Sequence, residues 1–214
     1  MGMNLKKNVF VVLVLSLLMS CNQPNNKQGL QSGDILFRGQ QANGLSQAID
    51  AVTQTEQAHH YTHMGIVELE NDTVWVIHAA PEKGVCKETL AQFCLPAQDS
   101  TLVGHYRIKN LPSTLLTSAI SMANAKLNAP YNYTYIIEDE GYYCSEFVYE
   151  LFAQDSIFQL EPMTFIDPAS GEFHPGWIKH YNGLEIDIPE GQLGCNPNGM
   201  AASDKLKFIA YINN

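Results

Sequence analysis

Hydrophobic and polar positions repeat along the chain in two different periods, which separate predicted strands from predicted helices. Apolar residues two apart between turn residues predict strands, whereas apolar residues three and four apart predict helices. The predicted strands cover 33–38, 59–68, 73–79, 102–108 and 207–212, and the predicted helices cover 44–52, 113–127 and the segment behind Cys144. A segment rich in Pro and Gly spans 162–194. This mixed order predicts an α+β fold in which an antiparallel sheet packs against helices.

Two of these strands form a hairpin whose register follows from its turn. The turn pair at 71–72, Asn followed by Asp, separates the strands. If both turn residues are central, paired residues have numbers that add up to 143, so Gly65 faces His78 and His63 faces Ala80. His63 and His78 then lie on one face as diagonal neighbours, about 7 to 8 Å apart at their backbones, and their rings can form a hydrogen bond.

Cys144 lies at the start of a predicted helix. The apolar residues behind it recur at helical spacing and can pack the helix on a core; they are Phe147, Val148, Leu151 and Phe152. The positive end of the helix dipole favours thiolate at this position, so we expect an activated cysteine with a lowered pKa. An unreactive core cysteine fits the same pattern, because free cysteine is among the most buried residue types. A nearby base would decide between the two.

The N-terminus has the pattern of a secretory signal. Lys6 and Lys7 precede an apolar run over 9–18, which is too short to span a membrane. The four residues at 18–21 resemble a bacterial lipobox, which implies that Cys21 is lipidated and becomes the mature N-terminus; a plain secretory peptide is the alternative. The predicted organisation is a signal peptide at 1–20, a flexible tether at 21–31 and a catalytic domain at 32–214. The expected location is the cell envelope, on the periplasmic side, lipid-anchored to a bacterial membrane.

The charge of the chain excludes some partners. The formal net charge is −10, and removal of Lys6 and Lys7 with the signal makes it −12. A nucleic-acid partner is not expected, because binding to phosphates needs clustered basic residues. The same charge opposes electrostatic attachment to anionic membranes, so membrane attachment would depend on the lipid. About 190 residues remain after the signal, enough for one compact domain.

Five cysteines are present, and two of them have assigned roles. With Cys21 lipidated and Cys144 a thiol, at most one disulfide can form among the other three. Cys86 and Cys94 are the local candidates for that disulfide, and Cys195 would then be free. The alternative is that all three are reduced core residues.

Four segments together resemble a known family. They are GDILF at 33–37, THMGIV at 62–67, PYN at 130–132 and YCSEFV at 143–148. In this order they resemble the circularly permuted NlpC-type papain-like cysteine peptidases and amidases, the YiiX-like enzymes, and more distantly the lecithin:retinol acyltransferase group. Permutation accounts for a histidine strand that precedes the cysteine helix. The resemblance covers about 33–153.

The resemblance implies a permuted papain-like fold and a role for each site residue. Cys144 would be the nucleophile, His63 the general base and acid, and His78 the group that orients His63. The backbone N–H of Cys144 would form part of the oxyanion hole. No cofactor is expected. The segment after Phe158 matches none of the four motifs, and we expect it to shape the substrate cleft.

The sequence therefore predicts a lipid-anchored thiol hydrolase of the cell envelope. It would cleave an amide bond, in peptidoglycan stem peptides, through an acyl-enzyme at Cys144. One alternative is a lipid acyl hydrolase or acyltransferase of the same fold, and another is a non-catalytic module that binds a peptide or a lipid. A metal-dependent site is a further alternative, with ligands from His59, His60, His63 and His78. Adjacent His59 and His60 would point to opposite sides of a strand, which disfavours it.

Overall fold

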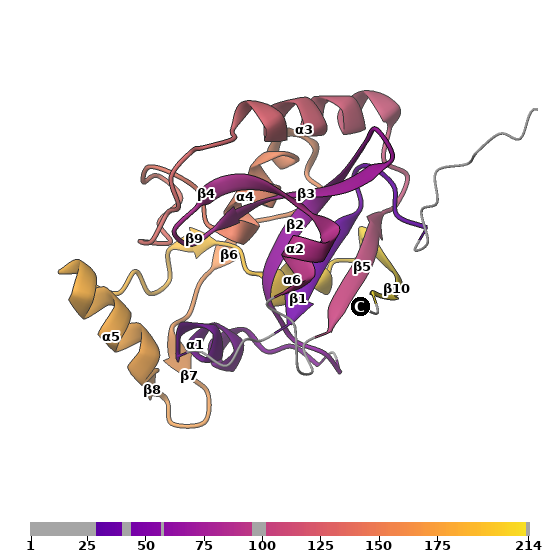
Figure 1. Ribbon diagram of the computed structural model, residues 1–214. Helices are drawn as coiled ribbons and strands as arrows, with labels where there is room; N and C mark the ends of the chain where they lie inside the picture. Colours follow the sequence, from indigo (N-terminus) through magenta and orange to yellow (C-terminus); the bar gives the residue numbers. More distant parts are fainter. Residues whose placement is uncertain (1–28, 40–43, 57, 96–101, 213–214) are drawn as a thin grey trace, which may run out of the picture.

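The computed structural model describes residues 29–39, 44–56, 58–95 and 102–212. The predicted signal peptide at 1–20, the lipidation site Cys21 and the tether as far as residue 28 lie outside the described residues. The described chain forms a six-stranded antiparallel sheet with helices packed against it (Figure 1). The predicted α+β fold class is confirmed.

The sheet places the first described strand near its centre. Its strand order is β10-β5-β1-β2-β3-β4, and each neighbouring pair is antiparallel. The strands are β1 Ile35–Gly39, β2 Tyr61–Glu70, β3 Thr73–Ala80, β4 Gly84–Thr89, β5 Val103–Ile108 and β10 Leu206–Ile212. Two small ladders lie outside this sheet and pair β6 Glu161–Pro162 with β9 Leu193–Gly194, and β7 Ile166–Asp167 with β8 Glu172–Phe173.

The helices come from both halves of the chain. They are α1 Gly44–Thr53, α2 Leu90–Cys94, α3 Ser113–Ala125, α4 Cys144–Glu150, α5 Pro175–Leu184 and α6 Pro197–Ala201, with a short 3-10 helix at Ala153–Asp155. Helix α4 packs against β2 and β3, whereas α2 packs against β3 and β4. None of the helices in the described part of the chain is long and apolar enough to cross a membrane.

Hydrophobic residues cover both faces of the sheet. On one face, side chains of β1, β2 and β3 such as Phe37, Met64 and Ile77 form a core with α4. On the other face, a smaller core includes Val67 and Phe93 of α2. Burial on both faces explains why β1 reads as a continuous apolar run rather than an alternating one.

The β2–β3 hairpin has the predicted register. Its ladder runs from Ile66 opposite Ile77 to Glu70 opposite Thr73, and the turn residues at 71–72 both have positive φ, as a two-residue hairpin turn requires. Gly65 faces His78, because a Cβ at Gly65 would lie 2.9 Å from the Cβ of His78. The ladder stops at the Ile66–Ile77 pair. The predicted pairing of His63 with Ala80 is therefore not part of the ladder.

Several elements were not predicted from the sequence. The segment after the hairpin forms β4 and α2, and α2 begins with a capping box in which Thr89 and Gln92 bond to each other's backbone N–H. In the Pro- and Gly-rich segment, α5 starts with Pro175 at its first turn and His174 as its cap. β4 and α2 are too short to show a clear hydrophobic period. The Pro and Gly residues around α5 indicate turns, so this helix was not predicted.

Two other expectations need correction. Cys86, Cys94, Cys144 and Cys195 are all free thiols, so the proposed Cys86–Cys94 disulfide is wrong and the reduced alternative holds for the described cysteines. Leu30 is buried in the smaller core, which means that the packed domain begins before residue 32.

Candidate active site

The loop before α4 holds Cys144 at the first position of that helix. Gly141 has a φ of +96°, and a Cβ there would lie 2.4 Å from the carbonyl oxygen of Pro130, so this turn needs glycine. Oε2 of the Glu146 side chain accepts a hydrogen bond from the Tyr143 N–H at 3.0 Å and one from Asn132 Nδ2 at 3.2 Å. These bonds join the PYN segment to the helix start, and Cys144 is 5% exposed.

The Cys144 sulfur lies at the end of the β2–β3 ladder. It accepts hydrogen bonds from the backbone N–H groups of Met64 and Ser145. Because backbone groups alternate in direction along a strand, the Met64 N–H points toward β3, but the ladder has already ended there. The sulfur thus accepts from an N–H group that would otherwise bond to a carbonyl oxygen of β3. This N–H belongs to Met64, the residue directly after His63.

His63 and His78 lie on the opposite face of the sheet from α4. Both rings contact Phe93 of α2, with ring centroids 5.8 Å and 5.1 Å apart. Their shared face confirms the hairpin prediction. Among the described residues no hydrogen bond joins His63 to the Cys144 sulfur, so direct proton transfer between them stays a prediction. The Met64 N–H that bonds to the sulfur belongs to the residue directly after His63.

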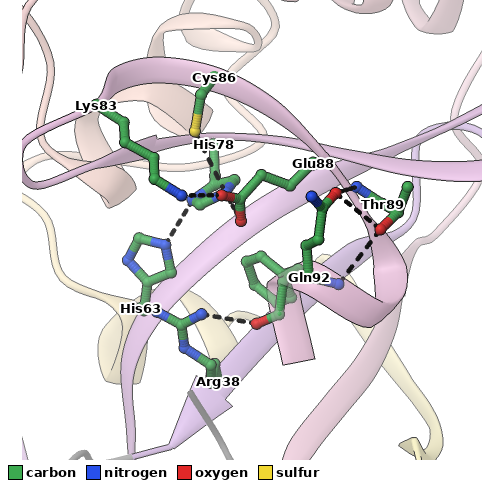
Figure 2. Close-up of polar contacts among 9 residues, drawn as sticks. Arg38, His63, His78, Lys83, Cys86, Glu88, Thr89 and Gln92 are labelled. Carbon is green, nitrogen blue, oxygen red and sulfur yellow. Dashed lines mark hydrogen bonds and ion pairs between the residues drawn. The ribbon is translucent and has the colours of Figure 1, made fainter. Parts of the chain in front are cut away.

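The two histidines begin a polar chain that runs to a carboxylate (Figure 2). His63 Nε2 lies 2.8 Å from His78 Nδ1, and His78 Nε2 lies 3.2 Å from Glu88 Oε2. The other oxygen of Glu88 bonds to Lys83 Nζ at 2.5 Å. The hydrogen bond from His78, with that from Lys83, lowers the pKa of Glu88 to about 2, against burial, so Glu88 is an ionised acceptor.

The hydrogen bonds between His63, His78 and Glu88 determine which nitrogen of each imidazole ring carries the proton. Burial lowers the pKa of His78, and burial together with the charge of Arg38 holds the pKa of His63 well below its ordinary value, so both rings are neutral. Ionised Glu88 can only accept, so His78 carries its proton on Nε2 and accepts at Nδ1. His63 then carries its proton on Nε2. Its Nδ1 is left with a free lone pair, which is the state a general base needs.

The expected low pKa of Cys144 is wrong for this structure. Burial raises the pKa of the Cys144 thiol to about 11, although the N–H groups of Met64 and Ser145 and the charge of Arg38 act in the opposite direction. The helix start does stabilise the thiolate, but desolvation outweighs it. Cys144 and His63 therefore form a neutral thiol and a neutral imidazole.

Glu88 and Arg38 belong to this site and were missed in the sequence. Glu88 lies two residues after Cys86 on β4, and Cys86 is directly opposite His78. Arg38 is buried at the end of β1, pairs in register with His63, and donates from Nη1 to the Phe93 carbonyl at 2.7 Å. An acidic residue in an alternating segment after the hairpin was the one signal for Glu88. For Arg38, the one signal in the sequence was a charged residue within an apolar strand.

A cleft of about 520 Å³ opens at Cys144. Its walls come from α1, the tyrosine-rich loop before α4, and the C-terminal part of the chain, which contributes Phe158, Met163 and Trp177. Charged side chains also line it, including Glu161 and Asp204. The expectation that the segment after Phe158 helps to shape a cleft agrees with this lining.

Of the four histidines in the metal alternative, His63 and His78 contact each other, but in the described part of the chain His59 and His60 belong to no group with metal-ligand spacing. His60 Nδ1 lies 3.3 Å from Asp50, and the His59 ring packs on Tyr211. In the described parts of the chain, a different group has metal-ligand spacing: one atom each of His78, Cys86 and Glu88, all within 4.8 Å of one another.

The comparisons with known proteins identify the family of the chain. Residues 29–210 match the profile of the family described as the permuted papain-like amidase enzyme, YaeF/YiiX, C92 family. The chain belongs to this family. It is therefore a papain-like hydrolase of the cysteine peptidase and amidase class, as the sequence resemblance implied.

The fold is also found in a solved structure, described as metalloprotein yiiX from Escherichia coli O157:H7. The TM-score is 0.69 at 20% sequence identity, and the match covers 84% of this chain and 96% of that one. At this identity the likeness supports the permuted papain-like fold alone. None of the curated proteins compared with the chain matches it.

Proposed function

We propose that the protein cleaves an amide bond through an acyl-enzyme at Cys144. The observation that carries this proposal is the series of hydrogen bonds from Glu88 through His78 to His63, together with the bond from the N–H of the next residue, Met64, to the Cys144 sulfur. Nucleophile, base and orienting groups come from four different elements, and family membership supplies the reaction class.

Catalysis starts from the neutral pair. His63 Nδ1 takes the thiol proton as the Cys144 sulfur attacks the substrate carbonyl carbon. The His63 imidazolium that forms is stabilised through His78 by the negative charge of Glu88. The positive charge of Arg38 favours the negative sulfur. His63 then donates its proton to the leaving amine, which leaves a thioester on Cys144.

Water completes the cycle. His63, neutral again, takes a proton from water as the water oxygen attacks the thioester carbonyl, and the sulfur leaves with the proton returned by His63. Backbone N–H groups at the start of a helix have no intrahelical acceptor, so the Cys144 N–H is available for the oxyanion of each tetrahedral intermediate.

The proposed substrate is the stem peptide of peptidoglycan, and the proposed location is the periplasmic side of a bacterial membrane, with lipid attached at Cys21. The support for both is the signal and lipobox pattern of the sequence. A lipid acyl ester is the second candidate, because apolar side chains such as Ile49, Phe158 and Met200 line the cleft.

The test compares muropeptides and acyl-lipids as substrates of the purified protein, each beside Cys144→Ala and the control Cys94→Ala. Cys94 is buried on the face away from α4, and its substitution should leave turnover largely intact. Release of an amine from muropeptides, with an acyl adduct on the Cys144 peptide, is expected. Turnover of acyl-lipids alone would favour the second candidate. Turnover that persists in Cys144→Ala would overturn the mechanism.

A further inference from the structure

A cluster of three potential metal ligands lies on β3 and β4, outside the cleft. His78 and Cys86 are directly opposite each other in the ladder, and Glu88 lies two residues after Cys86 on the same face of β4. The Cys86 sulfur is 3.6 Å from His78 Nε2, and that nitrogen is 3.2 Å from Glu88 Oε2 (Figure 2). All three ligand atoms lie within 4.8 Å of one another.

The two distances from His78 Nε2 fit a tetrahedral zinc ion. With Zn–S near 2.3 Å and Zn–N near 2.0 to 2.1 Å, tetrahedral geometry places the sulfur and nitrogen about 3.6 Å apart, and a nitrogen and a carboxylate oxygen about 3.4 Å apart. The observed separations are 3.6 Å and 3.2 Å. The His78–Cys86 and His78–Glu88 pairs therefore already have the spacing that the ion needs, and the Cys86 and Glu88 ligand atoms lie within 4.8 Å of each other.

The ligand types select the class of metal. Imidazole, thiolate and carboxylate together suit a borderline ion such as Zn²⁺, whereas Mg²⁺ and Ca²⁺ prefer oxygen ligands alone. One contact opposes the metal: Lys83 Nζ bonds to Glu88 Oε1. The Lys83 side chain is 63% exposed and can turn into solvent, and the ion would use the other oxygen of Glu88.

We propose that His78, Cys86 and Glu88 bind Zn²⁺ and that this ion switches the hydrolase off. None of the three residues lines the cleft, so the ion would not contact a substrate there. It would act through the hydrogen bond between His78 and His63.

Inhibition follows from the proton positions and rests on the proposed function. Zinc on His78 Nε2 displaces the proton from that nitrogen, so neutral His78 keeps its proton on Nδ1 and donates to His63 Nε2. His63 then carries its own proton on Nδ1. It presents an N–H group instead of a lone pair toward the thiol and can no longer act as base.

Binding is tested with Co²⁺ as a spectroscopic probe of the purified, full-length mature protein. A thiolate-to-cobalt charge-transfer band with a stoichiometry of one ion per chain is expected in wild type, and Zn²⁺ should displace the cobalt. The band should persist in Cys144→Ala and in the control Cys94→Ala, and should be lost in Cys86→Ala. Cys86→Ala should weaken zinc binding by about 100-fold, since loss of a ligand costs at least as much as loss of a supporting residue.

The site and the switch have separate outcomes. A band lost in Cys144→Ala and kept in Cys86→Ala would place the metal on the catalytic thiol and overturn the proposed site. Zinc should also raise the unfolding temperature of wild type and of Cys144→Ala but not that of Cys86→Ala. If the site binds zinc, the ratio of activities with and without zinc should fall at least tenfold in wild type and stay near one in Cys86→Ala. Equal inhibition of the two proteins would overturn the switch but would leave the proposed zinc site in place.

The proposed function has its own outcome. If Cys144→Ala retains full turnover, the proposed function fails, but the result of the binding experiment stands.

Discussion

The Nε2 atom of His63 lies 2.8 Å from the Nδ1 atom of His78, so the two strands of the hairpin are linked by one hydrogen bond between their imidazole rings. Each neutral ring has one donor and one acceptor, so this bond makes the proton position of one ring depend on the other. Glu88, at the far end, determines both.

Substitutions in the hydrogen-bonded series of His63, His78 and Glu88 should lower turnover by different amounts. We expect His63→Ala to lower kcat/KM by about 10² to 10⁴, because it removes the base itself. Glu88→Ala should cost about 10- to 100-fold, because His78 is then free to donate from either nitrogen and His63 spends less time as a base. The measurement is kcat/KM as a function of pH, with Glu70→Gln as an exposed control.

The pH profile separates a proton-positioning role for Glu88 from a structural one. A change in the profile with an unchanged unfolding temperature is expected for Glu88→Ala. If Glu88→Ala instead yields less folded protein, and the folded fraction has the pH profile of wild type, the proton-positioning role of Glu88 is wrong.

The Cys144 thiol should be labelled slowly at neutral pH. Burial raises its pKa to about 11, so its labelling rate with iodoacetamide should rise about tenfold per pH unit between about pH 6 and 10. Arg38→Gln should slow labelling at each pH, since the charge of Arg38 lowers the pKa of Cys144. The rates are measured by mass spectrometry of the Cys144 peptide, with Lys207→Gln as a control on the exposed sheet edge. A plateau below pH 8 would mean that a thiolate exists before substrate arrives.

Glu146 should make the protein less stable as the pH rises. Burial raises the pKa of Glu146 to about 7, above its ordinary value of 4.5. The folded state therefore holds a proton that the unfolded state releases, so stability is complete below pH 4.5 and falls as the pH rises toward and through 7, by on the order of 3 kcal/mol. Urea unfolding between pH 4 and 8 should show this fall in wild type and a flatter profile in Glu146→Gln. If both proteins and the exposed control Glu172→Gln have the same profile, the explanation fails.

Asp34 should stabilise the fold as a buried acceptor of several hydrogen bonds. It lies 2.6 Å from His105 Nε2 and 2.7 Å from Arg107 Nε. Burial acts to raise the pKa of Asp34, but the hydrogen bonds from Arg107, His105 and the Gln31 N–H lower it overall.

We expect Asp34→Asn to cost about 1.5 to 3 kcal/mol, because it weakens the hydrogen bonds that a buried carboxylate accepts. In wild type this stabilisation is present above the ordinary pKa of 3.8 and is lost as the pH falls through the lowered value. Denaturant unfolding measures both effects, with exposed Asp155→Asn as control. A cost below about 1 kcal/mol for Asp34→Asn would mean that these hydrogen bonds contribute little net stability.

Cys21 should anchor the protein to a membrane. We expect Cys21→Ser to move the protein from the membrane fraction to the soluble fraction, because the negatively charged domain has little electrostatic attraction to anionic lipids. Fractionation measures this, and mass spectrometry identifies the mature N-terminus. An unmodified N-terminus at any other residue would remove the lipoprotein proposal.

Local periodicity was enough to predict several parts of this protein from its residues alone. The hairpin register followed from a two-residue turn and a strand period of two, and these alone predict that His63 and His78 share one face. The helix behind Cys144 followed from apolar spacing, and four short motifs in a permuted order indicated the family. Each of these features is fixed by residues close together in the chain.

How these features meet depends on contacts between segments that are far apart in the chain. The sulfur of Cys144 bonds to the Met64 N–H where the β2–β3 ladder stops, so the cysteine lies next to the backbone of the histidine strand, which no local pattern encodes. Glu88 and Arg38 join the site because β4 and β1 lie near the histidines in space. The raised pKa of Cys144 has the same origin: a helix start favours thiolate locally, but the desolvation that outweighs it depends on everything packed around the sulfur.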